Sequence, residues 1–99
     1  MSLIMLGERD PKVLQAMYKY RNEVFKNGAV SVREKELLAM ALSSVAKCEK
    51  CFEYHADAAI QAGATPQEIL EIQEVVMYMT GPSAMIWSEK IDEYVNRKE

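Results

Sequence analysis

Hydrophobic residues recur along this chain at intervals of three and four positions, which is typical of amphipathic helices, and no stretch alternates with the two-residue period of a β-strand. Asp10 and Pro11 are typical of a helix start, and Asn27 and Gly28 of a helix end. The pattern predicts five helical segments, over about residues 10–26, 31–46, 48–63, 65–80 and from 83 onward.

Two of these segments begin at strong capping signals. Ser31 and Glu34 have the spacing of a capping box, and Thr65 and Glu68 repeat that spacing with a proline at the first helical position. The helix after Ser31 is apolar nearly all round over residues 37–42, so we expect neighbouring helices or another subunit to enclose it.

The length and apolar content favour one small domain that associates with itself. A chain of 99 residues buries only a modest core, yet 49% of its residues are hydrophobic. We therefore expect an all-α fold, a compact bundle of about five helices that forms a single domain over residues 1–99 and assembles as a homo-oligomer.

The charge and hydropathy of the chain exclude two classes of partner. A net charge of −3 and a pI near 5.2 argue against nucleic-acid binding, which requires a basic face. No run of apolar residues approaches the roughly 20 that cross a bilayer, and residues 1–8 lack the basic start of a signal peptide. These features predict a cytoplasmic protein with no membrane partner.

The candidate chemistry lies in residues 48–55, which contain both cysteines and the only histidine. On a helix, Cys48, Cys51 and His55 have i, i+3 and i+7 spacing, so they project from one face. A cytosolic cysteine pair is more often catalytic or metal-binding than structural, and a helix N-terminus favours the thiolate. An imidazole four residues after Cys51 can accept the thiol proton, and the second thiol can then close a disulfide.

Glu36 is a candidate fourth member of the site. It lies twelve residues before Cys48, on the preceding predicted helix. If the two helices pack antiparallel, the Glu36 carboxylate can face His55, orient the imidazole and share a polar pocket with both sulfur atoms. Glu34 competes as a capping residue, so the residues alone do not single out Glu36.

Together, the spacing of Glu36, Cys48, Cys51 and His55 resembles the signature of the alkylhydroperoxidase D-like proteins, within the carboxymuconolactone decarboxylase superfamily. The resemblance covers most of the chain, including residues 63–69, which open the next helix. It implies an all-helical subunit that forms oligomers, often trimers or hexamers, with the site close to a subunit boundary.

The resemblance also implies a reaction. A small hydroperoxide or a disulfide would be the substrate, with Cys51 as the attacking thiol, Cys48 as the resolving thiol, and Glu36 and His55 in a proton relay. No organic cofactor is implied, and an external dithiol would restore the thiols. Lys50 stands where the best-studied peroxidases of the family have a second histidine, which favours disulfide exchange over strong peroxidase activity.

Other interpretations of the same residues stay open. The decarboxylase branch of the superfamily lacks the cysteine pair, so the resemblance does not imply decarboxylation. The two thiolates and the imidazole could instead hold zinc or copper, with Glu36 or water as a fourth ligand, although structural zinc sites usually draw their ligands from separate segments. The chain could also be a redox sensor without turnover, or a helical assembly protein in which the cysteines are incidental.

Overall fold

The computed structural model describes the backbone of residues 1–99 and the side chains of residues 1–81 and 89–99. The backbone forms six helices and no strand, which confirms the predicted all-α class. The helices are α1 (Leu3–Arg9), α2 (Pro11–Val24), α3 (Val32–Val45), α4 (Glu49–Gln61), α5 (Pro66–Thr80) and α6 (Pro82–Lys98).

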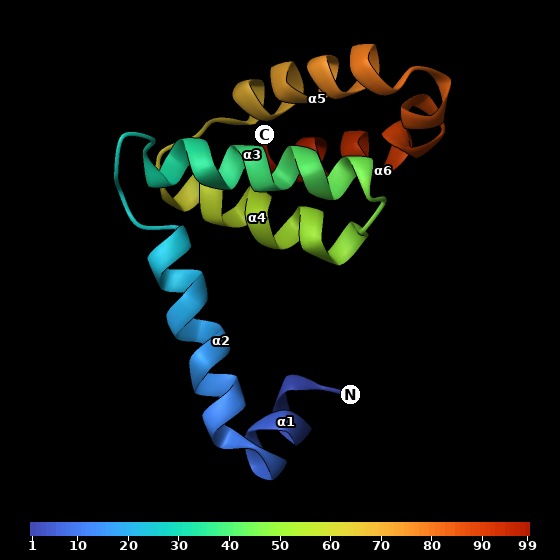
Figure 1. The fold of residues 1–99 in the computed structure, drawn as a ribbon. Coiled ribbons are helices and arrows are strands. Elements are labelled where there is room, and N and C mark those ends of the chain that lie inside the picture. The colour runs from blue at the N-terminus through green and yellow to red at the C-terminus, as the bar shows by residue number, and fades with distance from the viewer.

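The six helices divide into a bundle and an arm. The bundle consists of α3–α6, in which α3 packs against α4, α5 and α6, and α5 packs against α6. The arm consists of α1 and α2, which pack against each other and extend away from the bundle (Figure 1). The radius of gyration is 14.9 Å, above the roughly 13 Å of a compact chain of this length. The chain therefore has six helices where about five were predicted, because α1 forms as well, and the arm extends the molecule beyond the bundle.

The core lies entirely within the bundle. Phe52 of α4 and Tyr94 of α6 meet edge to face, with ring centroids 5.2 Å apart, and both side chains are almost fully buried. Ala56 and Ala59 of α4 are fully buried, and such small side chains let a neighbouring helix approach closely. The other buried members of this core are Leu37, Met40, Ala64, Ile69, Ile91 and Val95.

The arm, in contrast, buries none of its residues. Gly7 allows α1 to fold back onto α2, because a Cβ at this position would lie 3.1 Å from Leu14 Cδ2. The end of α2 is joined to α3 by Lys35, whose Nζ donates to the backbone carbonyls of Val24 at 2.9 Å and Lys26 at 2.6 Å. This ammonium satisfies carbonyls at the end of α2 that have no helical partner.

The predicted helix starts are largely confirmed. Thr65 and Glu68 form a complete capping box at α5. Ser31 caps α3, because its hydroxyl oxygen accepts a hydrogen bond from the Glu34 N–H. The Ser31 hydroxyl also donates to the Glu34 carboxylate, and this bond takes the place of the bond from the Ser31 N–H to Glu34 that a full capping box has. The last helix begins at Pro82, one residue before the predicted start, and the side chains of residues 82–88 lie outside the described part of the chain.

A polar cluster, which we call the clasp, joins α4 to α6. The buried Tyr94 hydroxyl donates to Asp57 Oδ1 at 2.5 Å, and Lys98 Nζ lies 3.1 Å from the same oxygen. Burial of Asp57 opposes its ionisation, but the hydrogen bonds from Tyr94 and Lys98 outweigh burial and lower the pKa of Asp57 below 3.8. Burial of Tyr94 and its bond to Asp57 raise the pKa of Tyr94 well above 10.0.

Within the described part of the chain, no helix has both the length and the apolar character of a membrane span.

Candidate functional site

The two cysteines lie where the chain turns from α3 into α4. Lys47 adopts a φ of 58°, a left-handed conformation that reverses the chain direction, and the Cys48 N–H donates to the Ser43 carbonyl at 3.0 Å. Cys48 is the N-cap of α4, and its Sγ accepts a hydrogen bond from the Cys51 N–H at 3.3 Å. A tight turn with an unusual backbone angle therefore holds both residues at the start of α4.

Cys48 and Cys51 form a disulfide, with a Cα–Cα distance of 5.3 Å. Cys51 is exposed, whereas Cys48 is half-buried. After reduction, the unpaired N–H groups and partial positive charge of the helix N-terminus would favour a thiolate here. A disulfide that closes so short a loop restricts the unfolded chain little, which is more consistent with a redox role than with a structural one.

Glu36 and His55, 19 residues apart, meet between α3 and α4. Glu36 is only 2% exposed, and its Oε2 lies 2.7 Å from His55 Nδ1. An ionised carboxylate can only accept, so this contact places the proton of a neutral imidazole on Nδ1. The other ring nitrogen, Nε2, is then the atom that can take a proton from a thiol.

The second oxygen of Glu36 is bound by an arginine from the arm. Arg21 Nη2 donates to Glu36 Oε1 at 3.1 Å, so each carboxylate oxygen has its own partner. The Arg21 guanidinium also lies over the rings of Phe25, at 5.0 Å, and Tyr54, at 5.4 Å. Phe25 stacks on the His55 ring with centroids 5.5 Å apart, and Tyr54 meets it edge-on at 5.0 Å. The imidazole is thereby fixed on three sides.

Arg21 and Phe25 were not among the residues predicted from the sequence. A buried glutamate requires a cation as well as a histidine, which is a reason to search for an arginine. Nothing in the helical pattern says which arginine reaches Glu36, because that depends on the path of residues 25–31.

The four predicted site residues fall into two pairs. Glu36 contacts His55 and Cys48 is bonded to Cys51, but among the hydrogen bonds of the described side chains none joins the imidazole to a sulfur atom. Cys51 and His55 are i, i+4 neighbours on α4, so they share a face and lie about 6 Å apart at the backbone. One helical turn therefore separates Cys51 from His55 along α4.

One member of each pair, His55 and Cys48, lines a cleft. A cleft of about 380 Å³ lies between the arm and α4, where Met17, Tyr18, Arg21, Tyr54 and His55 contribute to its wall. A second cleft, of about 490 Å³, is lined by charged residues and one cysteine: Cys48, Glu49, Lys50 and Glu53. A ligand bound beside His55 would lie one turn along α4 from Cys51.

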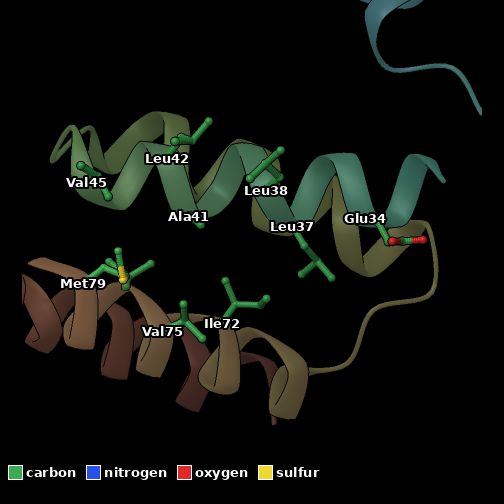
Figure 2. A pocket seen from close by; sticks show the side chains of 10 residues that line it. Glu34, Leu37, Leu38, Ala41, Leu42, Val45, Ile72, Val75 and Met79 are labelled. Carbon is green, nitrogen blue, oxygen red and sulfur yellow. The ribbon is translucent and has the colours of Figure 1, made fainter. Parts of the chain in front are cut away.

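A third cleft has a different character. The space of about 410 Å³ between α3 and α5 is lined by apolar side chains, with Glu34 as the single charged residue (Figure 2). Leu38, Leu42, Val75 and Met79 on its walls are each more than half exposed. It contains no thiol or imidazole, so it is a candidate contact surface and not a reaction site.

The metal alternative receives no support from this geometry. Among the described side chains, no three histidine, cysteine, aspartate or glutamate residues lie close enough together to bind a metal ion.

The comparisons with known proteins agree with the all-helical fold. The model of the carboxymuconolactone decarboxylase family matches residues 11–91. A crystal structure of a carboxymuconolactone decarboxylase family protein from Legionella pneumophila superposes with a TM-score of 0.85, at 25% identity, over 96% of this chain and 85% of that one. One from Thermotoga maritima gives a TM-score of 0.81 at 22% identity, over 96% of this chain and 81% of that one, which shows the shared fold.

Two relatives found by sequence are described as uncharacterised proteins. One, from the cox locus of Paracoccus denitrificans, is 36% identical over 67 residues, which are 68% of this chain and 60% of that protein. The other, from Cupriavidus necator, is 28% identical over 87 residues, which are 87% of this chain and 77% of that protein. The match to the Paracoccus protein thus spans less than two thirds of its length.

Proposed function

This chain belongs to the carboxymuconolactone decarboxylase family, and on that premise we propose that it is a thiol oxidoreductase of the alkylhydroperoxidase D-like type, using Cys48 and Cys51. One observation carries the proposal. An accessible disulfide begins α4, and one turn later the same helix presents a histidine held by a buried carboxylate. An oxidisable pair and a polarised base on one helix face are the groups that thiol-based redox chemistry needs.

With a hydroperoxide as substrate, the reaction takes two steps. The Cys51 thiolate attacks the distal oxygen, the O–O bond breaks, and an alcohol leaves after taking a proton, which converts Cys51 to a sulfenic acid. The Cys48 thiolate then attacks the Cys51 sulfur, the S–O bond breaks, and water leaves as the disulfide forms. Two thiols have lost two electrons, and the peroxide has become an alcohol and water. The greater exposure of Cys51 supports its role as the attacking residue.

The proton transfers fall to His55. Its Nε2 takes the proton from the Cys51 thiol and returns it to the leaving alkoxide, while Glu36 keeps Nδ1 protonated and stabilises the imidazolium. This requires the imidazole to reach across one helical turn after the disulfide is reduced. The cleft beside His55 gives a small organic hydroperoxide a route to this point.

The cycle closes by disulfide exchange with an external dithiol, such as a dithiol protein or a lipoyl group. A thiolate of the reductant attacks the exposed Cys51 sulfur, and Cys48 leaves as a thiolate at the N-terminus of α4. The second thiol of the reductant then attacks the mixed disulfide and frees Cys51. The exposed Lys50 beside Cys48 favours approach of an anionic thiolate.

The proposal extends to the assembly and the setting of the chain. We place it in the cytosol, where dithiol reductants keep such pairs reduced, and treat residues 1–99 as one domain. We propose a homo-oligomer, a trimer or hexamer, because the arm buries none of its residues and the apolar cleft between α3 and α5 lies open. Light scattering of the purified chain tests this, and a monomer at micromolar concentration would contradict it.

The test of function follows the fate of each sulfur. Reduced wild-type protein is mixed with substoichiometric tert-butyl hydroperoxide, and intact mass with peptide mapping is expected to show the loss of two hydrogens within residues 48–51. Cys48→Ser is expected to retain peroxide reactivity and to accumulate a sulfenic acid at Cys51 that a dione probe labels. Cys51→Ser is expected to react no faster than free cysteine. If both variants react with the hydroperoxide only as fast as free cysteine, the proposal is contradicted.

A turnover assay separates an enzyme from a redox sensor. With a reduced lipoyl compound or thioredoxin-type protein in excess, the enzyme consumes many equivalents of peroxide or disulfide for each chain. A sensor would consume one equivalent and stop.

A further inference from the structure

We propose that Arg21 is a positioning residue for the proton relay, which fixes the Glu36 carboxylate on His55 and sets the pH range in which His55 acts as a base. The proposal rests on the function proposed above. It adds that an arginine of the arm, outside the helices that carry the cysteines, controls the chemistry of the site.

The first argument is the way the Glu36 carboxylate is shared. Glu36 is 2% exposed, and in such a position a carboxylate needs a cation and a hydrogen-bond donor for its remaining lone pairs. Arg21 binds Oε1 at 3.1 Å and His55 Nδ1 lies 2.7 Å from Oε2. With one oxygen held by a permanently charged guanidinium, the other is directed at the imidazole. Without Arg21, only the contact with His55 holds the carboxylate.

The second argument is the way Arg21 itself is held. Its side chain is 31% exposed, and its guanidinium packs over the faces of Phe25 and Tyr54. The same two rings contact His55, so one cluster of aromatic side chains orients the arginine and the histidine together. A planar guanidinium suits this stacked position, which a lysine ammonium does not reproduce.

The third argument is the place of Arg21 in the fold. Arg21 belongs to α2, the long helix of the arm, which buries none of its residues. Among the hydrogen bonds of the described side chains, those that join α2 to α3 are made by two consecutive residues of α3, namely Lys35 on the end of α2 and Glu36 on Arg21. The attachment of the arm and the geometry of the relay therefore depend on the same short segment of α3.

The sign of the effect follows from the charges around His55. The titratable or charged groups that face it are Glu36 from α3, Arg21 and Tyr18 from α2, and Tyr54 from its own helix, while α1 contributes only Leu3. The positive charge of Arg21 thus opposes the protonation of the imidazole. Its removal leaves the full negative charge of Glu36 acting on His55, so the ring keeps its proton to higher pH.

The chain offers a direct readout, because His55 is its only histidine. In reduced protein, the imidazole signals followed by NMR from pH 5 to 9 give one titration midpoint without assignment work. In Arg21→Met this midpoint is expected to rise by roughly half to one and a half pH units relative to wild type. The rising limb of the pH dependence of kcat/KM for tert-butyl hydroperoxide is expected to move in the same direction.

Two further variants separate the charge from the structural contact. Arg21→Lys retains the charge but loses the planar contact, so its midpoint is expected to stay close to wild type although its thermal stability falls. Arg33→Met is the matched control. Arg33 pairs with Glu68 of α5, so this substitution removes an arginine–glutamate pair that does not contact His55. Its midpoint is expected to change by less than about 0.2 units at physiological ionic strength.

The outcomes are distinguishable. The inference is overturned if the His55 titration midpoint is unchanged in Arg21→Met, or if it shifts equally in Arg21→Met and Arg33→Met. It is also overturned if the midpoint moves while the pH dependence of kcat/KM does not. Arg21→Gln serves the same purpose if Arg21→Met does not fold. If wild-type protein shows no peroxide or disulfide turnover at all, the proposed function fails, and the NMR titration reports that separately.

Discussion

Helix α4 contributes side chains to two polar clusters, the relay of Glu36, His55 and Arg21 and the clasp of Asp57, Tyr94 and Lys98. Each cluster is built around an acid, and the groups that bind the acid differ. In the relay, Glu36 is 2% exposed and binds an imidazole and a guanidinium. In the clasp, the Asp57 side chain is 50% exposed and binds a phenol and an ammonium. His55 and Asp57 lie two positions apart on α4, so they face opposite sides of the helix.

The two clusters differ in whether they contain a group that can exchange a proton near neutral pH. Imidazoles in proteins titrate close to neutral pH, so a carboxylate that orients one can support proton transfer under cellular conditions. In the clasp, the raised pKa of Tyr94 and the lowered pKa of Asp57 move both titrations further from neutral pH. The clasp can join α4 to α6, but it has no proton to exchange at pH 7. The two acids therefore differ in function through the partner that each one holds, an imidazole for Glu36 and a phenol for Asp57.

The strongest test of this comparison makes the same chemical change in both clusters. Glu36→Gln is expected to lower kcat/KM for a hydroperoxide by roughly 10²-fold, because the imidazolium loses its anionic partner. Asp57→Asn is expected to leave kcat/KM within about twofold of wild type, since Asp57 contacts neither the imidazole nor a sulfur atom. Stopped-flow measurement of thiol oxidation checks both variants. Equal losses of activity in the two would show that the relay has no special role.

The second prediction concerns the contribution of the clasp to stability. Tyr94→Phe removes the hydroxyl that donates to Asp57 and is expected to reduce the free energy of unfolding by about 1 kcal/mol, with no change in kcat/KM. Denaturant unfolding followed by circular dichroism measures this loss at pH 7. A stability equal to that of wild type would show that the clasp does not hold α6 in place.

The third prediction uses the pH dependence of that contribution. The pKa of Tyr94 is raised in the folded state, so its stabilisation is fully present below pH 10.0, the ordinary value, and is lost as the pH rises toward the folded pKa. The stability difference between wild type and Tyr94→Phe is expected to shrink above pH 10, by at most about 1.4 kcal/mol per pH unit. Because both proteins share the other four tyrosines, a difference that is constant from pH 8 to 11 would contradict the assigned proton.

The Glu36–His55 contact could be anticipated once the family resemblance had singled out Glu36, because it depends on little of the fold. Only a short turn separates α3 from α4, so the two helices must pack antiparallel, and residue 36 then lies beside residue 55. The capping residues Asp10, Ser31 and Thr65 were equally local signals, each readable within four residues.

The arm could not be anticipated in the same way. Helix α1 has only seven residues with Gly7 among them, which is too short for a helical period to be recognised. Arg21 reaches Glu36 only because residues 25–31 take a particular path, with Asn27 accepting from the Val32 N–H and Lys35 closing the end of α2. Side-chain contacts of this kind are set by the tertiary fold, and no periodic pattern encodes them.

The smallest expected effect concerns the cleft between the arm and α4, and it asks whether substrate reaches the relay from that side. Met17 is 48% exposed and lines this cleft together with His55, so Met17→Trp would fill part of its volume of about 380 Å³ without a contact to Glu36 or the disulfide. The rate with cumene hydroperoxide is expected to fall about three- to tenfold, while the rate with hydrogen peroxide changes by less than twofold, since only the larger molecule needs the space.

Val13→Trp, on the same helix but outside this cleft, is the matched control. Equal effects of Met17→Trp on both peroxides would mean that the substrate reaches Cys51 from the charged cleft at the start of α4. The relay would then act on the thiol across the helix turn and not on a substrate bound beside it.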